Sequence, residues 1–190
     1  HLLALTGCVK ADYHILRAIF KQAALMNIAL ASDHTGFEQL KQLHAALESE
    51  GHSCVSFGPK SLDPADDYPD YIRPAAEAVG HGACERGIII GGSGQGEAMT
   101  ANRVFGVRCA VFYGPAVARA VIDVDGATSK DPYEILRLSR KHNDANMLSL
   151  AARFLSMDEI IKASTLWLST DFSAAERHRR RIAKIDKKEL

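Results

Sequence analysis

The 190-residue sequence has few of the features that indicate a membrane, nucleic-acid or disulfide-rich protein. It has no apolar run long enough to span a bilayer. Basic and acidic residues number 23 each, so the formal net charge is +0, which argues against nucleic acid or an anionic membrane as a partner. The four cysteines form no CxxC pair. This predicts reduced thiols in a cytoplasmic protein, with neither a zinc site nor disulfides.

The compact part of the chain is expected to begin near Met26. This residue directly precedes Asn27-Ile-Ala-Leu-Ala31, which has the composition of a buried strand. We therefore expect residues 1–25 to be an N-terminal extension, with apolar side chains spaced as in an amphipathic helix, and residues 26–190 to form a single domain. No internal repeat or low-complexity linker indicates a second domain.

The most informative stretch is Ile88-Ile-Ile-Gly-Gly-Ser-Gly-Gln-Gly-Glu97, an apolar run that ends in a glycine-rich turn. It predicts a buried strand followed by a helix that begins near Glu97. Such a turn leaves backbone N–H groups free beside a helix N-terminus and can hold an anion, with Ser93 and Glu97 at its rim. The alternative is a tight connection in which Glu97 only favours the start of the helix, and short glycine patterns alone do not decide between the two.

Strand-like and helix-like segments alternate along the rest of the chain. Strands are expected near 28–31, 53–57, 87–90, 107–112 and 147–150, and helices near 40–47, 71–80, 97–102, 135–141, 160–166 and 174–185. This order predicts βαβ units and a doubly wound parallel sheet, in which ligands bind beyond the carboxyl ends of the strands. We expect Asp33-His34, Ser93, Glu97 and His142-Asn143 to meet at that edge.

Five ordered motifs resemble one family, the type B ribose-5-phosphate isomerases and their galactose- and allose-6-phosphate relatives. The matching motifs are Ala31-Ser-Asp-His-Thr-Gly-Phe37, Asp67-Tyr-Pro-Asp-Tyr71, Gly92-Ser-Gly-Gln-Gly-Glu97 with Ala101-Asn-Arg103, Ser139-Arg-Lys-His-Asn-Asp-Ala-Asn146 and Glu176-Arg-His-Arg-Arg-Arg-Ile182. The resemblance covers roughly Met26 to Lys184. It implies a Rossmann-like, three-layer α/β/α sandwich with a five-stranded parallel sheet, and an aldose–ketose isomerase that works without metal or cofactor. It also implies a homodimer or homotetramer with shared active sites.

The resemblance assigns catalytic roles to three residues. In many members a cysteine just before the glycine turn is the base, but Gly91 stands at that position here. A subgroup instead has a glutamate after the turn, and Glu97 matches it. Ser93 matches the hydroxyl that moves a proton between the substrate oxygens, and His142 matches the residue that opens the sugar ring. The plainer alternatives are a helix-start carboxylate for Glu97 and a helix-capping imidazole for His142.

The resemblance also predicts a substrate-binding set. Asp33 would contact sugar hydroxyls, Asn143 the substrate, and Tyr68 would line the pocket. A phosphate would lie among His34, Arg153, Arg177 and Arg181, because the planar guanidinium forms paired, charge-assisted bonds. The remaining predicted contacts come from the motif around the turn: Gly92, Gly94, Gly96 and Asn102. The plainer alternative for the basic C-terminal run is a solvated helix face.

One segment departs from the family pattern. Relatives pass almost directly from the fourth strand to a segment like Asp131-Pro-Tyr133, whereas Tyr113 to Lys130 is inserted here. We expect the insertion at the ligand edge, where it could change the pocket or a subunit interface. The favoured substrates are ribose 5-phosphate and ribulose 5-phosphate. Another sugar phosphate, such as a tetrose or hexose phosphate, and a non-catalytic phosphosugar-binding domain are the alternatives.

Overall fold

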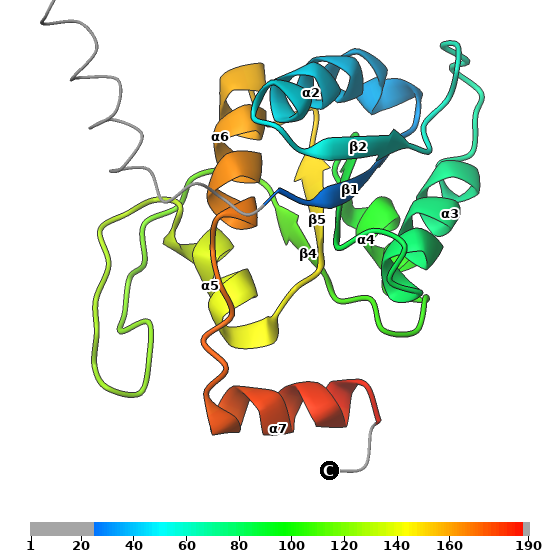
Figure 1. Ribbon diagram of the computed structural model, residues 1–190. Helices are drawn as coiled ribbons and strands as arrows, with labels where there is room; N and C mark the ends of the chain where they lie inside the picture. The colour runs from blue at the N-terminus through cyan, green and yellow to red at the C-terminus, as the bar shows by residue number, and fades with distance from the viewer. Residues whose placement is uncertain (1–24, 188–190) are drawn as a thin grey trace, which may run out of the picture.

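The computed structural model describes residues 25–187 of the chain (Figure 1). Residues 1–24, and with them most of the expected N-terminal extension, lie outside this range, so the domain boundary at Met26 stays a prediction. Five parallel strands form one sheet in the order β2-β1-β3-β5-β4. The strands are β1 (Asn27–Ser32), β2 (Ser53–Ser56), β3 (Arg86–Gly91), β4 (Cys109–Phe112) and β5 (Met147–Ala151).

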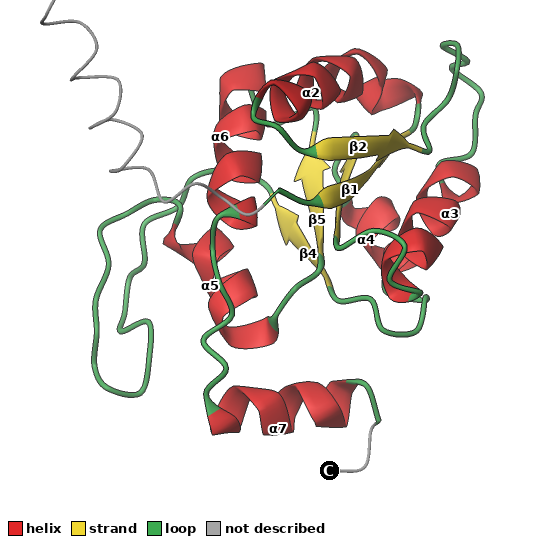
Figure 2. Cartoon of the chain, viewed as in Figure 1, coloured by secondary structure: helices red, strands yellow, loops and turns green. Residues whose placement is uncertain are grey.

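Helices cover both faces of the sheet, as Figure 2 shows. One face packs against α2 (Phe37–Ser49), α5 (Glu134–Asn143) and α6 (Met157–Leu168), and the other against α3 (Pro69–Gly80) and α4 (Gln95–Ala101). A short 3₁₀ turn, η1 (His34–Gly36), follows β1, and α7 (Glu176–Ile185) contacts α5. The predicted three-layer α/β/α sandwich is therefore confirmed. No described helix is long and apolar enough to cross a membrane.

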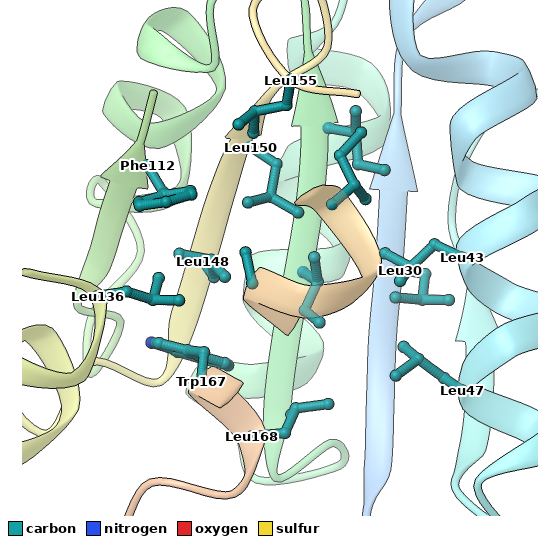
Figure 3. Packing of buried hydrophobic residues seen from close by; sticks show 14 of the residues in the cluster. Leu30, Leu43, Leu47, Phe112, Leu136, Leu148, Leu150, Leu155, Trp167 and Leu168 are labelled. Atoms are coloured by element: carbon teal, nitrogen blue, oxygen red, sulfur yellow. The ribbon is translucent and has the colours of Figure 1, made fainter. Parts of the chain in front are cut away.

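The alternation of side chains along the strands divides the core into two layers. Ile28 and Leu30 of β1 belong to the core layer on the face of α2 and α6. In Figure 3, Leu30 lies beside Leu43 of α2, and Trp167 of α6 lies near Leu148 of β5 and Leu136 of α5. The intervening small side chains of β1 point to the other face and allow α3 to approach the sheet closely. A fully buried Leu or Ile side chain contributes about 1.5–3 kcal/mol to folding, so these layers hold the sheet edge that carries the site.

The order of the strands reverses between β1 and β3. After β1 the chain turns into α2 on one face, whereas after β3 it turns into α4 on the other. The loops therefore diverge and leave a crevice beyond the carboxyl ends of two adjacent strands, which is where ligands bind in doubly wound sheets. Asp33 follows β1 and Gly92 follows β3, so both predicted motifs reach this crevice.

Candidate active site

The glycine-rich turn between β3 and α4 forms the floor of the candidate site. Gly94 has φ +72, a left-handed conformation that an L side chain rarely adopts. The buried Ser149 of β5 donates its hydroxyl to the Gly94 carbonyl at 2.7 Å and fixes the turn. Within the described part of the chain, the N–H groups of Ser93 and Gly94 donate no hydrogen bond, which leaves them for a ligand. The turn is therefore built to receive an anion or a developing oxyanion.

Glu97 projects from the first turn of α4 and is buried, with 5% of its surface exposed. Burial raises the pKa of its carboxyl above the usual 4.5, the negative charge of Asp33 raises it further, and a bond from its own backbone N–H partly opposes the rise. A carboxyl with a raised pKa, in a crevice beside an anion-binding turn, is typical of a general acid or base.

The Glu97 carboxylate lies directly beside the backbone of Gly91. A Cβ added at Gly91 would lie 1.9 Å from Glu97 Oε1 and 2.0 Å from its Cδ. The Glu97 carboxylate therefore fills the volume into which the side chain of residue 91 would point. This explains why a chain with a glutamate after the turn has glycine before it.

Gly91→Ala is expected to lower turnover at least tenfold while the protein stays folded. The new methyl group meets the end of a flexible side chain, so the Glu97 carboxylate moves and the backbone does not. We would measure kcat and thermal unfolding for Gly91→Ala, Glu97→Ala and the double variant. Because both changes act on one group, the double variant should be no slower than Glu97→Ala alone. Additive losses would contradict this coupling.

Asp33 and His34 lie at the end of β1, on the other side of the crevice. Asp33 is buried, and its carboxylate accepts hydrogen bonds from the backbone N–H and hydroxyl of Thr35. His34 Nδ1 lies 2.6 Å from Asp66 Oδ1. Ligand atoms of Asp33, His34 and Asp66 come within 4.8 Å of one another, the spacing of a cation site. The His34 nitrogen in this group is Nδ1. Because Nδ1 already forms a hydrogen bond with Asp66, its lone pair is not free to bind a metal there.

Arg153 and Tyr68 complete this side of the site. The backbone N–H of Arg153, just after β5, donates to the Gly92 carbonyl at 3.1 Å, and its exposed guanidinium lies over the turn. The Tyr68 ring lies against Gly96, where an added Cβ would be 2.7 Å from its hydroxyl oxygen. The structure thus brings together the predicted residues of the carboxyl edge: Asp33, His34, Tyr68, Gly92, Ser93, Gly94, Gly96, Glu97 and Arg153.

The expectation that His142 and Asn143 share this edge is wrong. They end α5, which runs back from the carboxyl end of β4 to the amino end of β5. The five residues of β5, at about 3.3 Å each, separate the two edges by roughly 15 Å. A helix between parallel strands must end at the amino edge, so the error lay in placing a helix C-terminus with the loops that follow strands.

His142 packs against a buried histidine, His178, to which the sequence prediction gave no role. The His142 and His178 rings lie 4.4 Å apart between centroids, and His178 Nδ1 is 2.8 Å from the Ser173 hydroxyl. Burial lowers the pKa of His142, and the nearby His178, Arg177 and Lys141 lower it further, while Asp123 of the inserted segment partly opposes them. Sequence placed His178 inside a basic run, and no local signal distinguishes a buried imidazole from a solvated one.

Helix α7 carries Arg177 and Arg181 one turn apart, as predicted, beside His142. Arg108 holds the end of this helix. It donates to Asp186 at 3.0 Å and to the carbonyls of Asn143 and Asp144, also at 3.0 Å. Asp144, two residues after His142, pairs with Arg140 at 2.6 Å and with Arg108 at 3.4 Å.

Asn102 and the inserted segment are the two remaining features that the sequence analysis singled out. The Asn102 side chain bonds the backbone N–H and carbonyl of Cys109 at 2.8 and 3.0 Å, so it joins α4 to β4. The inserted segment, residues 113–130, leaves the carboxyl end of β4 but extends along α5 (Figure 1), and its Asp123 acts on His142. The insertion thus begins at the predicted edge and reaches the opposite one.

The fold and the crevice define a doubly wound α/β protein with an anion-binding turn, a buried carboxylate and a separate cluster of histidine and arginine. The profile of the ribose/galactose isomerase family matches residues 28–128 and 117–185. The chain therefore belongs to that family. The two matched ranges overlap within the inserted segment, the place where this chain departs from the family pattern.

Named relatives agree with this assignment. The chain is 34% identical over 157 residues to ribose-5-phosphate isomerase B of Mycolicibacterium paratuberculosis, covering 83% of this chain and 87% of that protein. A structure of ribose-5-phosphate isomerase B from Clostridium thermocellum superposes with a TM-score of 0.73 at 33% identity, covering 85% and 96% of the two chains. The Mycoplasma genitalium enzyme with bound ribulose-5-phosphate gives 0.72 at 34% identity, covering 85% and 94%.

Proposed function

We propose that this protein is an aldose–ketose isomerase that interconverts ribose 5-phosphate and ribulose 5-phosphate. The observation that carries the proposal is the buried Glu97 carboxylate in the space beside Gly91, adjoining an anion-binding turn. A non-catalytic phosphosugar-binding domain has no need of a buried carboxyl with a raised pKa. The ribulose-5-phosphate bound to the Mycoplasma genitalium enzyme supports this class of substrate.

Once the sugar ring is open, the proton transfers of the isomerisation need only the residues of the crevice. Glu97 takes the proton from C2 of the open-chain aldose and returns it to C1 of the enediolate. The Ser93 hydroxyl passes a proton between the two substrate oxygens, so the sum is an isomerisation without a co-reactant. The N–H groups of the turn stabilise the negative charge that develops on oxygen, and hydrogen-bond donors in this role contribute about 3–4 kcal/mol each.

We further propose that each site is completed by a second copy of the chain, in a homodimer or a homotetramer. Glu97 and His142 lie at opposite edges of one subunit, so one chain cannot bring them to the same sugar. β4 is an edge strand, and next to it Met99 of α4 and Tyr113 are 66% and 49% exposed around a shallow cavity. A partner covering this apolar surface would carry its His142, Asn143, Arg177 and Arg181 toward Glu97.

Arg177→Ala and Arg181→Ala are each expected to raise KM for ribose 5-phosphate by roughly 10- to 100-fold. A hydrogen bond to a charged group contributes about 1.5–3 kcal/mol, and every 1.4 kcal/mol is a factor of ten. Arg180→Ala is the matched control, because the Arg180 guanidinium pairs with Glu176 on the exposed side of α7 at 3.1 Å. If all three variants keep the KM of the wild-type protein, the basic run is a solvated face.

The test of the proposed function is a direct assay with four-, five- and six-carbon aldose phosphates. Ribose 5-phosphate should give the highest kcat/KM. A preference for a tetrose or hexose phosphate would move the assignment to that sugar, with the inserted segment as the first place to seek the cause. Binding of ribose 5-phosphate without turnover would support the non-catalytic alternative. We also propose a cytoplasmic location, in line with the unpaired Cys54, Cys84 and Cys109.

A further inference from the structure

Asp66 lies in the loop before α3 and contacts His34, at the start of η1. Its Oδ1 lies 2.6 Å from His34 Nδ1 and accepts the His34 backbone N–H at 3.3 Å. The Asp66 side chain is 4% exposed and that of His34 is 29% exposed. One buried oxygen thus fixes both the backbone and the ring of His34, and the other ring nitrogen is left to meet a ligand.

The second carboxylate oxygen of Asp66 has no partner. Asp66 Oδ2 is buried and accepts no hydrogen bond within residues 25–187. A buried carboxylate with a single bonded oxygen is costly unless a positive charge lies beside it. The group in that place is the His34 imidazole, so the pair is most stable when His34 carries a proton on each nitrogen.

We propose that Asp66 is a positioning residue that holds His34 in one orientation and in its charged form, so that His34 binds the phosphate group of the substrate. This inference rests on the proposed function, because it assumes a phosphate ligand in the crevice. A charged imidazole donates a stronger bond to phosphate than a neutral one, and a fixed ring loses less entropy on binding.

The charges around His34 favour this role. The bond to Asp66 and the charges of Asp33 and Asp66 raise the pKa of His34, while partial burial and Arg153 lower it, and the net direction is upward. With a raised pKa, His34 stays charged as the pH increases past the usual 6.5 of a histidine. Loss of the Asp66 charge would let His34 become neutral at a lower pH.

The test compares the full-length wild-type protein with Asp66→Asn and with a matched control, Asp67→Asn. Asp67 is the exposed neighbour of Asp66, and its side chain forms no bond with the described residues. We would follow the His34 ring by NMR as a function of pH, with and without inorganic phosphate. We would also measure kcat and KM for ribose 5-phosphate between pH 6 and 9.

Asp66→Asn should lower the pKa of His34 and weaken its response to phosphate. KM should rise about tenfold at the alkaline end of this range, with a smaller increase at the acidic end, where protonation of His34 depends less on Asp66. The value of kcat should change less than twofold, and Asp67→Asn should match the wild type. Because the phosphate group titrates alike for all three proteins, the ratio of KM values isolates His34.

An unchanged pKa of His34 in Asp66→Asn would overturn the proposal, as would a rise in KM that is the same at every pH. A lowered pKa with an unchanged KM would show that His34 does not bind the phosphate, and would also overturn it. If the wild-type protein fails to isomerise ribose 5-phosphate, the proposed function fails, while the NMR titration with inorganic phosphate still decides the role of Asp66.

Discussion

Replacing Glu97 with glutamine is expected to lower turnover of ribose 5-phosphate by roughly 10²- to 10⁴-fold, the usual contribution of a general base. Glutamine keeps the shape of the side chain but cannot accept the proton from C2. KM should change little, because the carboxylate acts on a carbon-bound proton, whereas His34 and the arginines hold the phosphate group. Steady-state kinetics with ribose 5-phosphate would measure both constants.

A second glutamate separates catalysis from a general effect at a helix start. Glu38 stands in the first turn of α2, is exposed and pairs with Lys41 at 3.1 Å. Glu38→Gln therefore removes the same charge from an equivalent helix position, and it should leave turnover unchanged. Near-normal turnover in Glu97→Gln would mean that this carboxylate serves only the start of α4.

The pH dependence of turnover should show the environment of Glu97. The pKa of its carboxyl is raised, chiefly by burial and then by Asp33. A base works only when it is deprotonated, so activity is present above this pKa and is lost as the pH falls through it. The acid limb of kcat/KM should therefore lie above the usual 4.5 of a glutamate.

The sequence predicted the fold because its local and global signals agree. The apolar run Ile88–Ile90 is fully buried as β3, and the helical spacing of Leu40, Leu43 and Leu47 places all three in the core under α2. Each predicted strand and helix is present, and its predicted bounds differ from the observed ones by at most three residues. The motifs that follow β1 and β3 then had to meet at one edge, because parallel strands end together.

What the sequence could not predict depends on contacts between distant residues. Asp63, Asp67 and Asp70 lie within four residues of Asp66, and only the fold selects Asp66 as the partner of His34, 32 positions away. From the sequence alone, the pKa of His142 could be raised or lowered, because Asp144 would raise it and the basic Arg140 and Lys141 would lower it. Folding settles it by pairing Asp144 with two arginines and burying His142 against His178.

His142→Asn is expected to remove ring opening and to leave the isomerisation itself intact. Ribose 5-phosphate rests as a closed ring, whereas the enediolate forms only from the open chain. Opening the ring moves a proton from the anomeric hydroxyl to the ring oxygen, and an imidazole can carry protons in this pH range. The lowered pKa of His142 leaves it mainly neutral near pH 7, ready to accept the first of these protons.

The loss of kcat/KM should be roughly 10²-fold, the lower end of general acid–base effects. A variant cannot change the overall equilibrium constant, so kcat/KM must fall by the same factor in both directions. Comparing the two directions at low enzyme concentration therefore does not identify the step. The dependence on enzyme concentration does, because a variant without ring opening must wait for the open chain to form in solution.

With enzyme in excess over ribose 5-phosphate, the rate constant for conversion by His142→Asn should reach a plateau at the rate of spontaneous ring opening. The wild-type rate should rise past this value and level off only when all of the ribose 5-phosphate is bound. Consumption of ribulose 5-phosphate, which cannot close the same ring, should show no such plateau in either protein. His81→Asn, at the exposed end of α3, is the control for loss of an imidazole and should behave as the wild type.

The plateau distinguishes ring opening from every role in binding or structure. Damage to phosphate binding by Arg177, or to the contact with His178, would slow the variant, but its rate would level off only when the substrate is fully bound, at the rate of the bound complex. Only a step that occurs off the enzyme sets the plateau at the independently measured rate of spontaneous ring opening. A rate that keeps rising with His142→Asn concentration past the spontaneous limit would therefore remove His142 from ring opening and leave it a binding residue.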